Sequence, residues 1–299
     1  MRPTARLGAA GLLVASAALL GACAPAAADA DTLEASTAPA EPLVFAMPPG
    51  TDDPDILGQA EVLMTHIEEA TGREVELETP ADYLGVVEAV RQGFVDVALM
   101  SPFSTALAVA NGSVAPLLAW EASDEPASTC YVLADSPIES VEDVAGRQVA
   151  FVDPGSTTGY FMPTSLLAEH GLVDGEDYTS TFAGGHDSAM LAMLNGSVDV
   201  ACTSIADMLI EAGVFTEADV KVIGETAPIP VGVSIVVRTD LDDPTREHLV
   251  DGLPDAIAGD GTLELFTGSG AVIDDPDEET YAPLLQVAEN VGISLEDLR

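Results

Sequence analysis

Short apolar runs alternate with helical patterns along most of the chain. Residues 43–47 predict a strand, and the helix that follows is closed by Gly72. A second strand is expected at residues 74–77, then a helix that begins near Tyr83, then a strand at residues 95–99. The order strand, helix, strand, helix, strand is typical of a parallel sheet with helices on both faces.

The same order of elements returns in the second half of the chain. Residues 89–98 align with residues 192–201 and are identical at six positions, and Ser101 aligns with Ser204 just beyond. Two copies at such a long spacing are too few for a solenoid. The repeat therefore predicts two α/β lobes of one design.

Two further strands are expected to connect the lobes. An apolar run at residues 131–133 would carry the chain into the second lobe, and a β-branched run at residues 231–237 would carry it back. Helices expected at residues 244–257 and 279–290 would then complete the first lobe. The predicted fold class is α/β, with two Rossmann-like lobes joined by two crossing hinge strands.

The expected boundaries place lobe 1 at residues 42–127 plus 234–299 and lobe 2 at residues 128–233. In open α/β sheets, ligands bind beyond the carboxyl ends of the strands. Both lobes should therefore aim their loops at one shared cleft, which is where we expect the ligand.

A run of hydroxyl side chains falls in the turn between a strand at residues 148–152 and the helix after it. Ser156, Thr157 and Thr158 would lie where unpaired backbone N–H groups and the helix dipole favour an anion. The alternative is that Ser156 only caps its helix. Pro163 lacks the N–H needed to continue a helix begun at Thr157, so we expect a first turn followed by a kink or restart.

The repeat itself selects two further candidate site residues. Tyr83 and His186 occupy equivalent positions, each at the start of the helix before the Val-Asp-Val-Ala strand. Each should point into the cleft from its own lobe. The alternative for His186 is a helix-start histidine held by Asp187 or by solvent.

The N-terminus has the pattern of a secretory signal. Arg2 and Arg6 precede an apolar run at residues 7–20, and small residues lead to Cys23 in the manner of a bacterial lipobox. A membrane-spanning anchor is the alternative, but the apolar run is shorter than the ~20 residues that a span needs. We expect a signal peptide at residues 1–22, lipid on Cys23, and a flexible tether at residues 23–41.

The net charge is strongly negative, with 51 acidic against nine basic residues and a formal charge of −42. This balance argues against nucleic acid and anionic lipid headgroups as partners. An anionic ligand would have to be held locally by oriented neutral donors. The hydrophobic fraction of 47% suits a chain with proper globular cores.

Cys130 and Cys202 remain beside the expected lipid-bearing cysteine. In an exported protein they suggest a disulfide, with two buried free thiols as the alternative. The histidines are scattered, and neither cysteine has a His or Cys at ligand spacing, so no metal site and no cofactor are expected.

Taken together, the arrangement resembles the substrate-binding lipoproteins of ABC importers for phosphonate, phosphite and phosphate, which have the type II periplasmic binding protein fold. The matching segments are residues 82–89, 93–98, 153–159, 185–187 and 195–201. The resemblance implies an exported, membrane-anchored monomer that hands a small oxyanion to an ABC permease and performs no chemistry on it. It also implies that Tyr83, Ser156, Thr157, Thr158 and His186 bind the ligand.

Three positions depart from the family pattern. Thr129 stands where relatives often place an aromatic contact. Ala206 and, less securely, Gly232 stand where relatives that bind aminoalkylphosphonates are expected to place acids. Without that counter-charge we expect a ligand without an amine, namely phosphite, phosphate or a short alkylphosphonate.

Two alternatives remain open at this stage. One is a binding lipoprotein of the same fold for sulfonate, nitrate or a small organic ligand. The other is a secreted hydrolase with Ser156 as nucleophile and His186 as base, although the chain lacks a Gly-x-Ser-x-Gly elbow.

Overall fold

The computed structural model describes residues 41–48, 54–258, 260, 263, 271–274 and 276–290. They belong to one unit, Ala40–Arg299. The predicted signal peptide, most of the tether and Cys23 lie outside the described residues.

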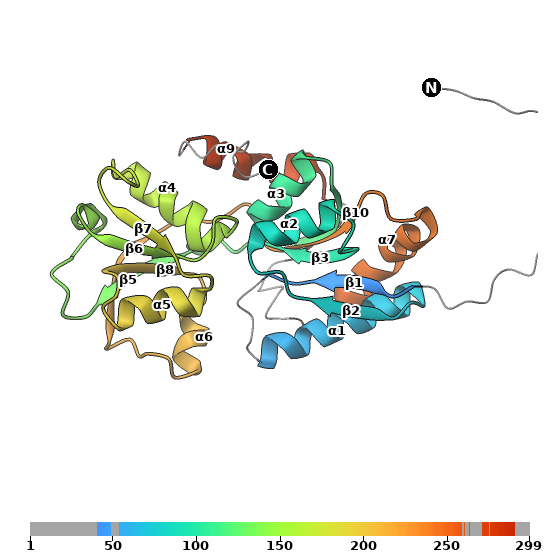
Figure 1. Cartoon of the computed structure of the whole chain (residues 1–299), viewed down its shortest axis with the longest axis horizontal. Coiled ribbons are helices and arrows are strands. Elements are labelled where there is room, and N and C mark those ends of the chain that lie inside the picture. Colours follow the sequence, from blue (N-terminus) through green and yellow to red (C-terminus); the bar gives the residue numbers. More distant parts are fainter. Residues whose placement is uncertain are drawn as a thin grey trace, which may run out of the picture. The chain divides into compact units, whose positions relative to one another are not determined.

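The first sheet has the strand order β11-β4-β10-β3-β1-β2, of which Figure 1 labels β10, β3, β1 and β2. Its strands β1, β2 and β3 are parallel, whereas β10 runs antiparallel to both β3 and β4. The strands are β1 Leu43–Ala46, β2 Val75–Glu78, β3 Val97–Met100, β4 Val114–Trp120, β10 Ser234–Arg238 and β11 Val272–Asp274. Its helices are α1 Pro54–Thr71, α2 Tyr83–Arg91, α3 Pro102–Ala110, α7 Asp243–Ala258 and α9 Glu278–Asn290.

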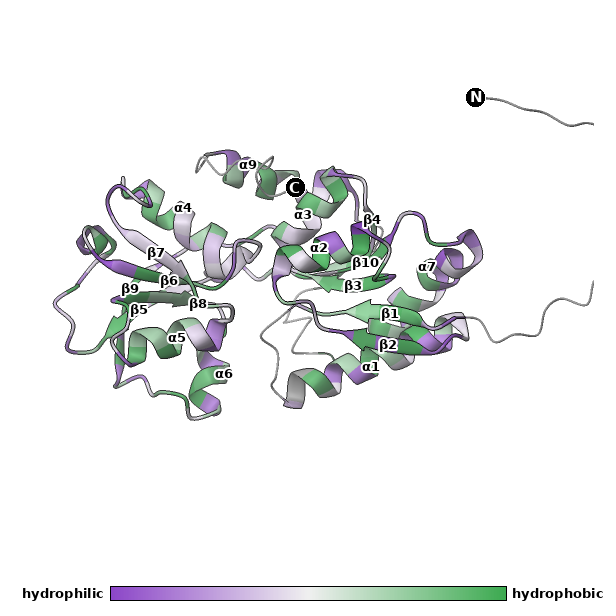
Figure 2. Cartoon of the chain, in the orientation of Figure 1, coloured by the Kyte–Doolittle hydropathy of each residue, from purple (hydrophilic) through white to green (hydrophobic). Residues whose placement is uncertain are grey.

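Alternate residues of these strands pack against helices on opposite faces. Leu43 and Phe45 belong to the core formed with α1 and α7, whereas Ala46 belongs to the core formed with α2 and α3. This period of two is the pattern of strands that are buried on both sides. Figure 2 shows the result as apolar strands in the middle of the sheet.

The second sheet has the order β7-β6-β8-β5-β9, and β5 runs antiparallel to both of its neighbours. Helix α4 and η1 pack on one face, and α5 and α6 on the other. The strands are β5 Thr129–Leu133, β6 Gln148–Phe151, β7 Thr179–Phe182, β8 Val200–Thr203 and β9 Val220–Glu225. The helices are η1 Val141–Val144, η2 Thr157–Phe161, α4 Met162–Glu169, α5 His186–Leu194 and α6 Ala206–Glu211.

The predicted α/β class with two lobes is therefore confirmed. Both sheets are mixed, because β10 in the first sheet and β5 in the second run antiparallel to their neighbours. The outgoing and returning connections also pair with each other. Thr226 N–H donates to Ser128 O at 2.9 Å, and Ser128 N–H donates to Thr226 Oγ1 at 2.9 Å. The expected return strand at residues 231–237 begins only at Ser234, where it joins the first sheet. The exact lobe boundaries stay a prediction.

Each copy of the repeat uses its aspartate in the same way. Asp96 Oδ2 accepts the Val44 N–H at 2.9 Å, and Asp199 Oδ2 accepts the Gln148 N–H at 2.9 Å. In return the Asp96 and Asp199 N–H groups donate to the carbonyls of Val44 and Gln148. The carboxylate thus satisfies a strand N–H at the sheet end away from the expected cleft.

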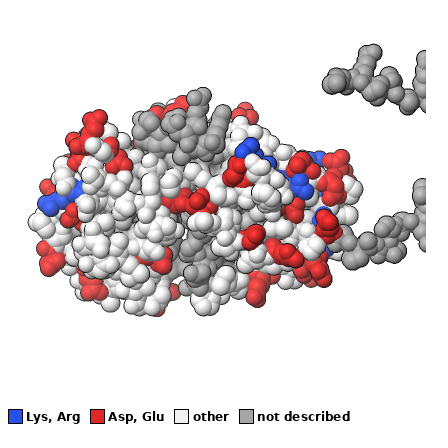
Figure 3. Space-filling view, in the orientation of Figure 1, with Lys and Arg blue, Asp and Glu red and all other residues white. Residues whose placement is uncertain are grey.

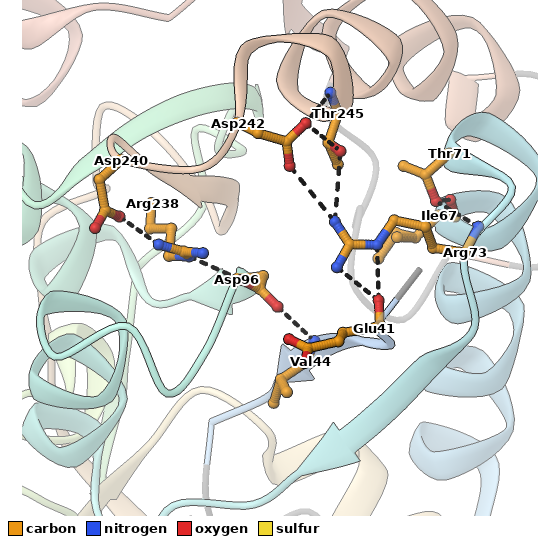
Figure 4. A network of polar contacts seen from close by, with 10 residues as sticks. All are labelled: Glu41, Val44, Ile67, Thr71, Arg73, Asp96, Arg238, Asp240, Asp242 and Thr245. Carbon is orange, nitrogen blue, oxygen red and sulfur yellow. Dashed lines mark hydrogen bonds and ion pairs between the residues drawn. The ribbon is translucent and has the colours of Figure 1, made fainter. Parts of the chain in front are cut away.

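Among the described residues, only the first of these aspartates, Asp96, also binds a cation. Arg238 Nε donates to Asp96 Oδ1 at 2.7 Å, and Arg238 Nη1 donates to Asp240 at 2.7 Å (Figure 4). In a second group, Arg73 binds the Glu41 carbonyl and the Asp242 carboxylate. Figure 3 shows how strongly acidic side chains outnumber basic ones on the face drawn.

Cys130 and Cys202 are joined by a disulfide in the structure. The two residues face each other across β5 and β8, and both are buried. The bridge closes a loop over a sequence separation of 72 residues and links the first strand of the second sheet to its central strand.

The matched aspartates allow the ion pair to be tested. Asp96→Asn keeps an acceptor for Val44 N–H but removes the charge facing Arg238, so it should lower the free energy of unfolding by roughly 2–3 kcal/mol, between values for exposed and buried pairs. Asp199→Asn should cost less, about 1 kcal/mol, since it only replaces a charge-assisted hydrogen bond from the Gln148 N–H by a neutral one. Urea denaturation measures both. Equal costs would show that Arg238 contributes nothing measurable.

Candidate ligand-binding site

The hydroxyl turn begins where β6 ends and is shaped by Pro163. The α-helical partner of a Pro163 N–H would be the Gly159 carbonyl, and that carbonyl instead accepts the Val152 N–H at 3.0 Å. A π-turn, η2, spans Thr157–Phe161, and the regular helix α4 starts at Met162. The restart expected from the sequence is therefore observed.

This turn faces the other lobe and is buried by it. Ser101 Oγ and Ser104 Oγ donate to the Gly155 carbonyl at 3.0 and 3.1 Å, and Phe103 N–H donates to Thr157 Oγ1 at 2.8 Å. A Cβ on Gly155 would lie 2.7 Å from the Tyr83 Cβ, so only glycine permits this approach. The turn thus lies at the boundary between the lobes.

Ser156 has both roles considered from the sequence. Its Oγ accepts the Gly159 N–H at 3.0 Å, which is a helix cap, and its side chain also hydrogen-bonds Tyr83 from the first lobe. Burial, and then the Asp153 carboxylate, raises the pKa of Tyr83 to about 12. Tyr83 therefore stays a neutral hydroxyl donor at any physiological pH.

The hydrogen bonds that the Ser156 and Thr157 side chains already make determine which hydroxyl hydrogens can still be donated to a ligand. Thr157 Oγ1 accepts a backbone N–H, so its hydroxyl hydrogen remains available to an acceptor. Ser156 Oγ accepts the Gly159 N–H and shares one hydrogen bond with Tyr83, so one hydroxyl hydrogen of that pair remains available. An anion, which only accepts, suits such donors. The Phe103 N–H thus holds the Thr157 side chain in place without using its proton.

His186 begins α5 and contacts two hydroxyl groups of its own lobe. Its Nδ1 lies 3.0 Å from Thr203 Oγ1, and its Nε2 lies 3.4 Å from Thr158 Oγ1, which in turn lies 3.0 Å from Ser204 Oγ. Burial lowers the pKa of His186 to about 4, although the Asp187 charge opposes the shift. The ring is therefore neutral near pH 7.

The network also favours one tautomer of that ring. Thr203 Oγ1 accepts the Ile205 N–H at 3.2 Å, so its own hydrogen is free to point at His186 Nδ1. With Nδ1 accepting, the proton resides on Nε2, the nitrogen that faces Thr158. A contact of 3.4 Å is loose for this donor and leaves it free to turn to a better acceptor.

Thr129 lies on β5 directly opposite Thr203. Its side chain hydrogen-bonds Tyr131, whose pKa burial raises. The structure thus brings Thr129 beside the strand that carries the His186 partner, whereas Tyr83, Ser156 and the two threonines after it meet at the lobe boundary.

Four residues of this arrangement were not selected from the sequence: Ser101, Ser104, Thr203 and Ser204. The internal repeat carried a signal for two of them, because Ser101 aligns with Ser204. Both hydroxyls follow the Val-Asp-Val-Ala strand of their copy, and both contact the turn, one from each lobe.

The charged groups around the turn are acidic or distant. Asp153 is buried, and its Oδ1 accepts the Gly155 N–H at 2.7 Å; burial, with a contribution from Asp82, raises its pKa. The ion pairs of Lys and Arg in the described ranges lie elsewhere, at Arg73, Arg91, Lys221, Arg238 and Arg246. The groups near the turn that could bind an anion are therefore neutral: hydroxyls, backbone amides and an imidazole.

The described part of the chain lacks two features that would change this picture. No cluster of three or more His, Cys, Asp or Glu residues there could hold a metal ion. In the same part of the chain, no helix combines the length and apolar character that a membrane span requires.

Residues 45–271 match the family described as the periplasmic substrate-binding protein of phosphonate ABC transporters. The chain belongs to this family. It is 30% identical over 276 residues to the phosphate-import protein PhnD of Mycolicibacterium smegmatis, covering 86% of this chain and 84% of that protein. The resemblance inferred from the residues is thereby confirmed.

Solved structures agree on the fold. A binding protein component of an ABC phosphonate transporter from Pseudomonas aeruginosa superposes with a TM-score of 0.71 at 23% identity, covering 85% of this chain and 87% of its own. PhnD1 from Prochlorococcus marinus, in complex with methylphosphonate, gives a TM-score of 0.71 at 15% identity and covers 85% and 99%. The two-lobed periplasmic binding protein fold is thus confirmed for this chain.

The geometry offers little to a hydrolase. Ser156 Oγ is engaged with Gly159 and Tyr83, and the ring nitrogens of His186 contact Thr203 and Thr158. A nucleophile and its base should be within hydrogen-bond reach of each other, and these contacts pair neither residue with the other.

The depressed pKa of His186 predicts a specific dependence of stability on pH. The unfolded chain binds a proton near pH 6.5 and the folded chain only near pH 4, so the free energy of unfolding should fall as the pH drops between these values. The loss should reach roughly 3 kcal/mol.

His186→Gln should remove this pH-dependent part of the free energy of unfolding and leave the contributions of the carboxylates unchanged. Urea denaturation of both proteins between pH 7.5 and about pH 4 therefore isolates it as their difference. Parallel stability profiles would mean that the histidine is not desolvated in the folded protein.

Proposed function

We propose that this chain is an extracytoplasmic lipoprotein that captures a small phosphorus oxyanion between its lobes and delivers it to an ABC permease. The ligand class is phosphite, phosphate or a short alkylphosphonate. The observation that carries the proposal is the buried turn at Ser156 and Thr157, where the Thr157 hydroxyl hydrogen and one hydrogen of the Ser156–Tyr83 pair remain free to donate to an anion at the boundary between the lobes.

Four of the candidate residues donate to the anion in this proposal. Thr157, Thr158 and the first amides of η2 bind the oxygens from the second lobe, His186 donates through Nε2, and Tyr83 donates from the first lobe. Neutral donors suffice because a closed site excludes water, which strengthens each hydrogen bond to the anion. Binding also stabilises the closed form, which is how a permease distinguishes loaded from empty protein.

The absence of an amine from the ligand follows from two residues. Ala206 opens α6, and Gly232 packs on Trp120, its N–H donating to the Trp120 carbonyl at 2.7 Å. Neither provides a carboxylate for an ammonium group. The relatives support the phosphorus class, since one is named for phosphate import and one was solved with methylphosphonate.

Attachment to the outer face of the cell membrane completes the proposal. Lipid on Cys23 and the tether at residues 23–41 would keep a monomeric binding protein near its permease, even though its surface charge is unsuited to anionic headgroups. The family is periplasmic, which supports the extracytoplasmic location.

Titration calorimetry against a panel of anions tests the ligand class. Phosphite, phosphate and methylphosphonate should include the tightest ligand, and 2-aminoethylphosphonate should bind at least about tenfold more weakly than methylphosphonate, the cost of an ammonium group without a counter-charge. Sulfate and nitrate serve as controls. Tight binding of sulfate, nitrate or an alkanesulfonate with no response to the phosphorus compounds would assign the site to a different oxyanion.

The turn itself is tested by Thr157→Ala. Loss of one hydroxyl donor to a charged ligand should weaken binding of the preferred anion by ~1–3 kcal/mol. Thr157→Ser retains the hydroxyl and should stay close to wild type. Because Thr157 Oγ1 also accepts the Phe103 N–H, part of the loss arises from the contact between lobes. Equal affinities for the alanine variant and the wild type would remove Thr157 from the site.

A further inference from the structure

The first turn of α3 reaches across to the second lobe through three hydrogen bonds that involve no ligand. Ser101 and Ser104 both donate to the Gly155 carbonyl, and Phe103 N–H donates to Thr157. Every side chain in this set is buried, with Ser104 and Thr157 each only 1% exposed. Water therefore does not compete for these groups while the lobes are together.

An apolar contact accompanies the hydrogen bonds. The Phe103 ring lies against the Phe161 ring, with centroids 3.4 Å apart, and both rings are buried. Leu107 from α3 and Ala288 from α9 complete this cluster. The C-terminal helix thus packs on the same junction, in addition to its contacts with α3.

These groups would face solvent if the lobes separated. The Gly155 carbonyl would then exchange two serine hydroxyls for water, and Phe103 N–H would exchange a threonine for water. Each such exchange is worth a factor of about 2–10 in an equilibrium, because water replaces most of the bond. Contacts of this size favour closure and still permit opening.

We propose that Ser101, Phe103 and Ser104 form a latch that sets how firmly the lobes close, so that residues which do not touch the anion tune its affinity. This inference rests on the proposed function, because it assumes that closure traps a ligand. The latch binds the backbone of the turn at Gly155, next to the hydroxyls proposed to hold the anion. Closing the lobes and forming the site are therefore one event.

Ser104 is the better residue for a test. Ser101 also caps α3, where its Oγ accepts the Ser104 N–H at 3.3 Å, so changing it would disturb the helix start. Ser104 Oγ donates only across the boundary among the contacts described for it. Thr105 offers a matched control, since its buried hydroxyl donates to the Ser101 carbonyl within its own lobe at 3.0 Å.

The experiment compares wild type, Ser104→Ala and Thr105→Val in two ways. Small-angle X-ray scattering without ligand should show a larger radius of gyration for Ser104→Ala than for wild type or Thr105→Val, or an unchanged radius if the free wild type is already open. Calorimetry and stopped-flow fluorescence of Trp120, with the preferred phosphorus oxyanion, should show a Kd raised about 3–10-fold. The change should lie in the dissociation rate.

The outcomes separate the latch from the ligand assignment. An unchanged Kd and scattering curve for Ser104→Ala, or the same change in Thr105→Val, would overturn the latch. If none of the phosphorus compounds binds the wild type, the proposed function fails, and the scattering comparison, repeated with whichever anion the panel identifies, still decides the latch. Ser104→Thr, which restores a hydroxyl, should recover the wild-type dissociation rate.

Discussion

Proline at position 163 has no amide hydrogen, and the hydrogen bonding of the turn before it follows from that fact. The Gly159 carbonyl is released from the helix and binds Val152 instead, which ties the turn back to the end of β6. Ser156 caps this π-turn and Thr157 is its first residue. One missing donor thus sets the form of the turn that carries the two hydroxyls around which the rest of the site lies.

The second constraint is electrostatic. A chain with a formal charge of −42 would repel an anion if its site depended on long-range attraction. The cations with described ion pairs are instead paired with carboxylates away from the turn, as Arg238 is with Asp96. Short-range, oriented dipoles avoid the conflict, because they act over a few ångströms in a place from which water is excluded.

Much of this architecture could be predicted from the sequence because it is local or repeated. The restart at Pro163 follows from proline chemistry, and the alignment of Asp96 with Asp199 reveals two lobes whose aspartates make the same bond. What could not be predicted depends on contacts between distant segments. Ser104 meets Gly155 only after both lobes have folded, and no pattern near either residue announces the contact.

The direction of the returning strand β10 could not be predicted for a similar reason. The β-branched run that ends at Arg238 predicts a strand, but its antiparallel pairing with β3 is set by the path of the chain between the lobes. The disulfide shows how that path is secured. Because disulfides persist in oxidising compartments, the covalent link between these two strands suits a member of a periplasmic family. A copy kept among cytosolic reductants would have to hold the two strands together by packing alone, so the periplasmic setting of the family also completes the fold.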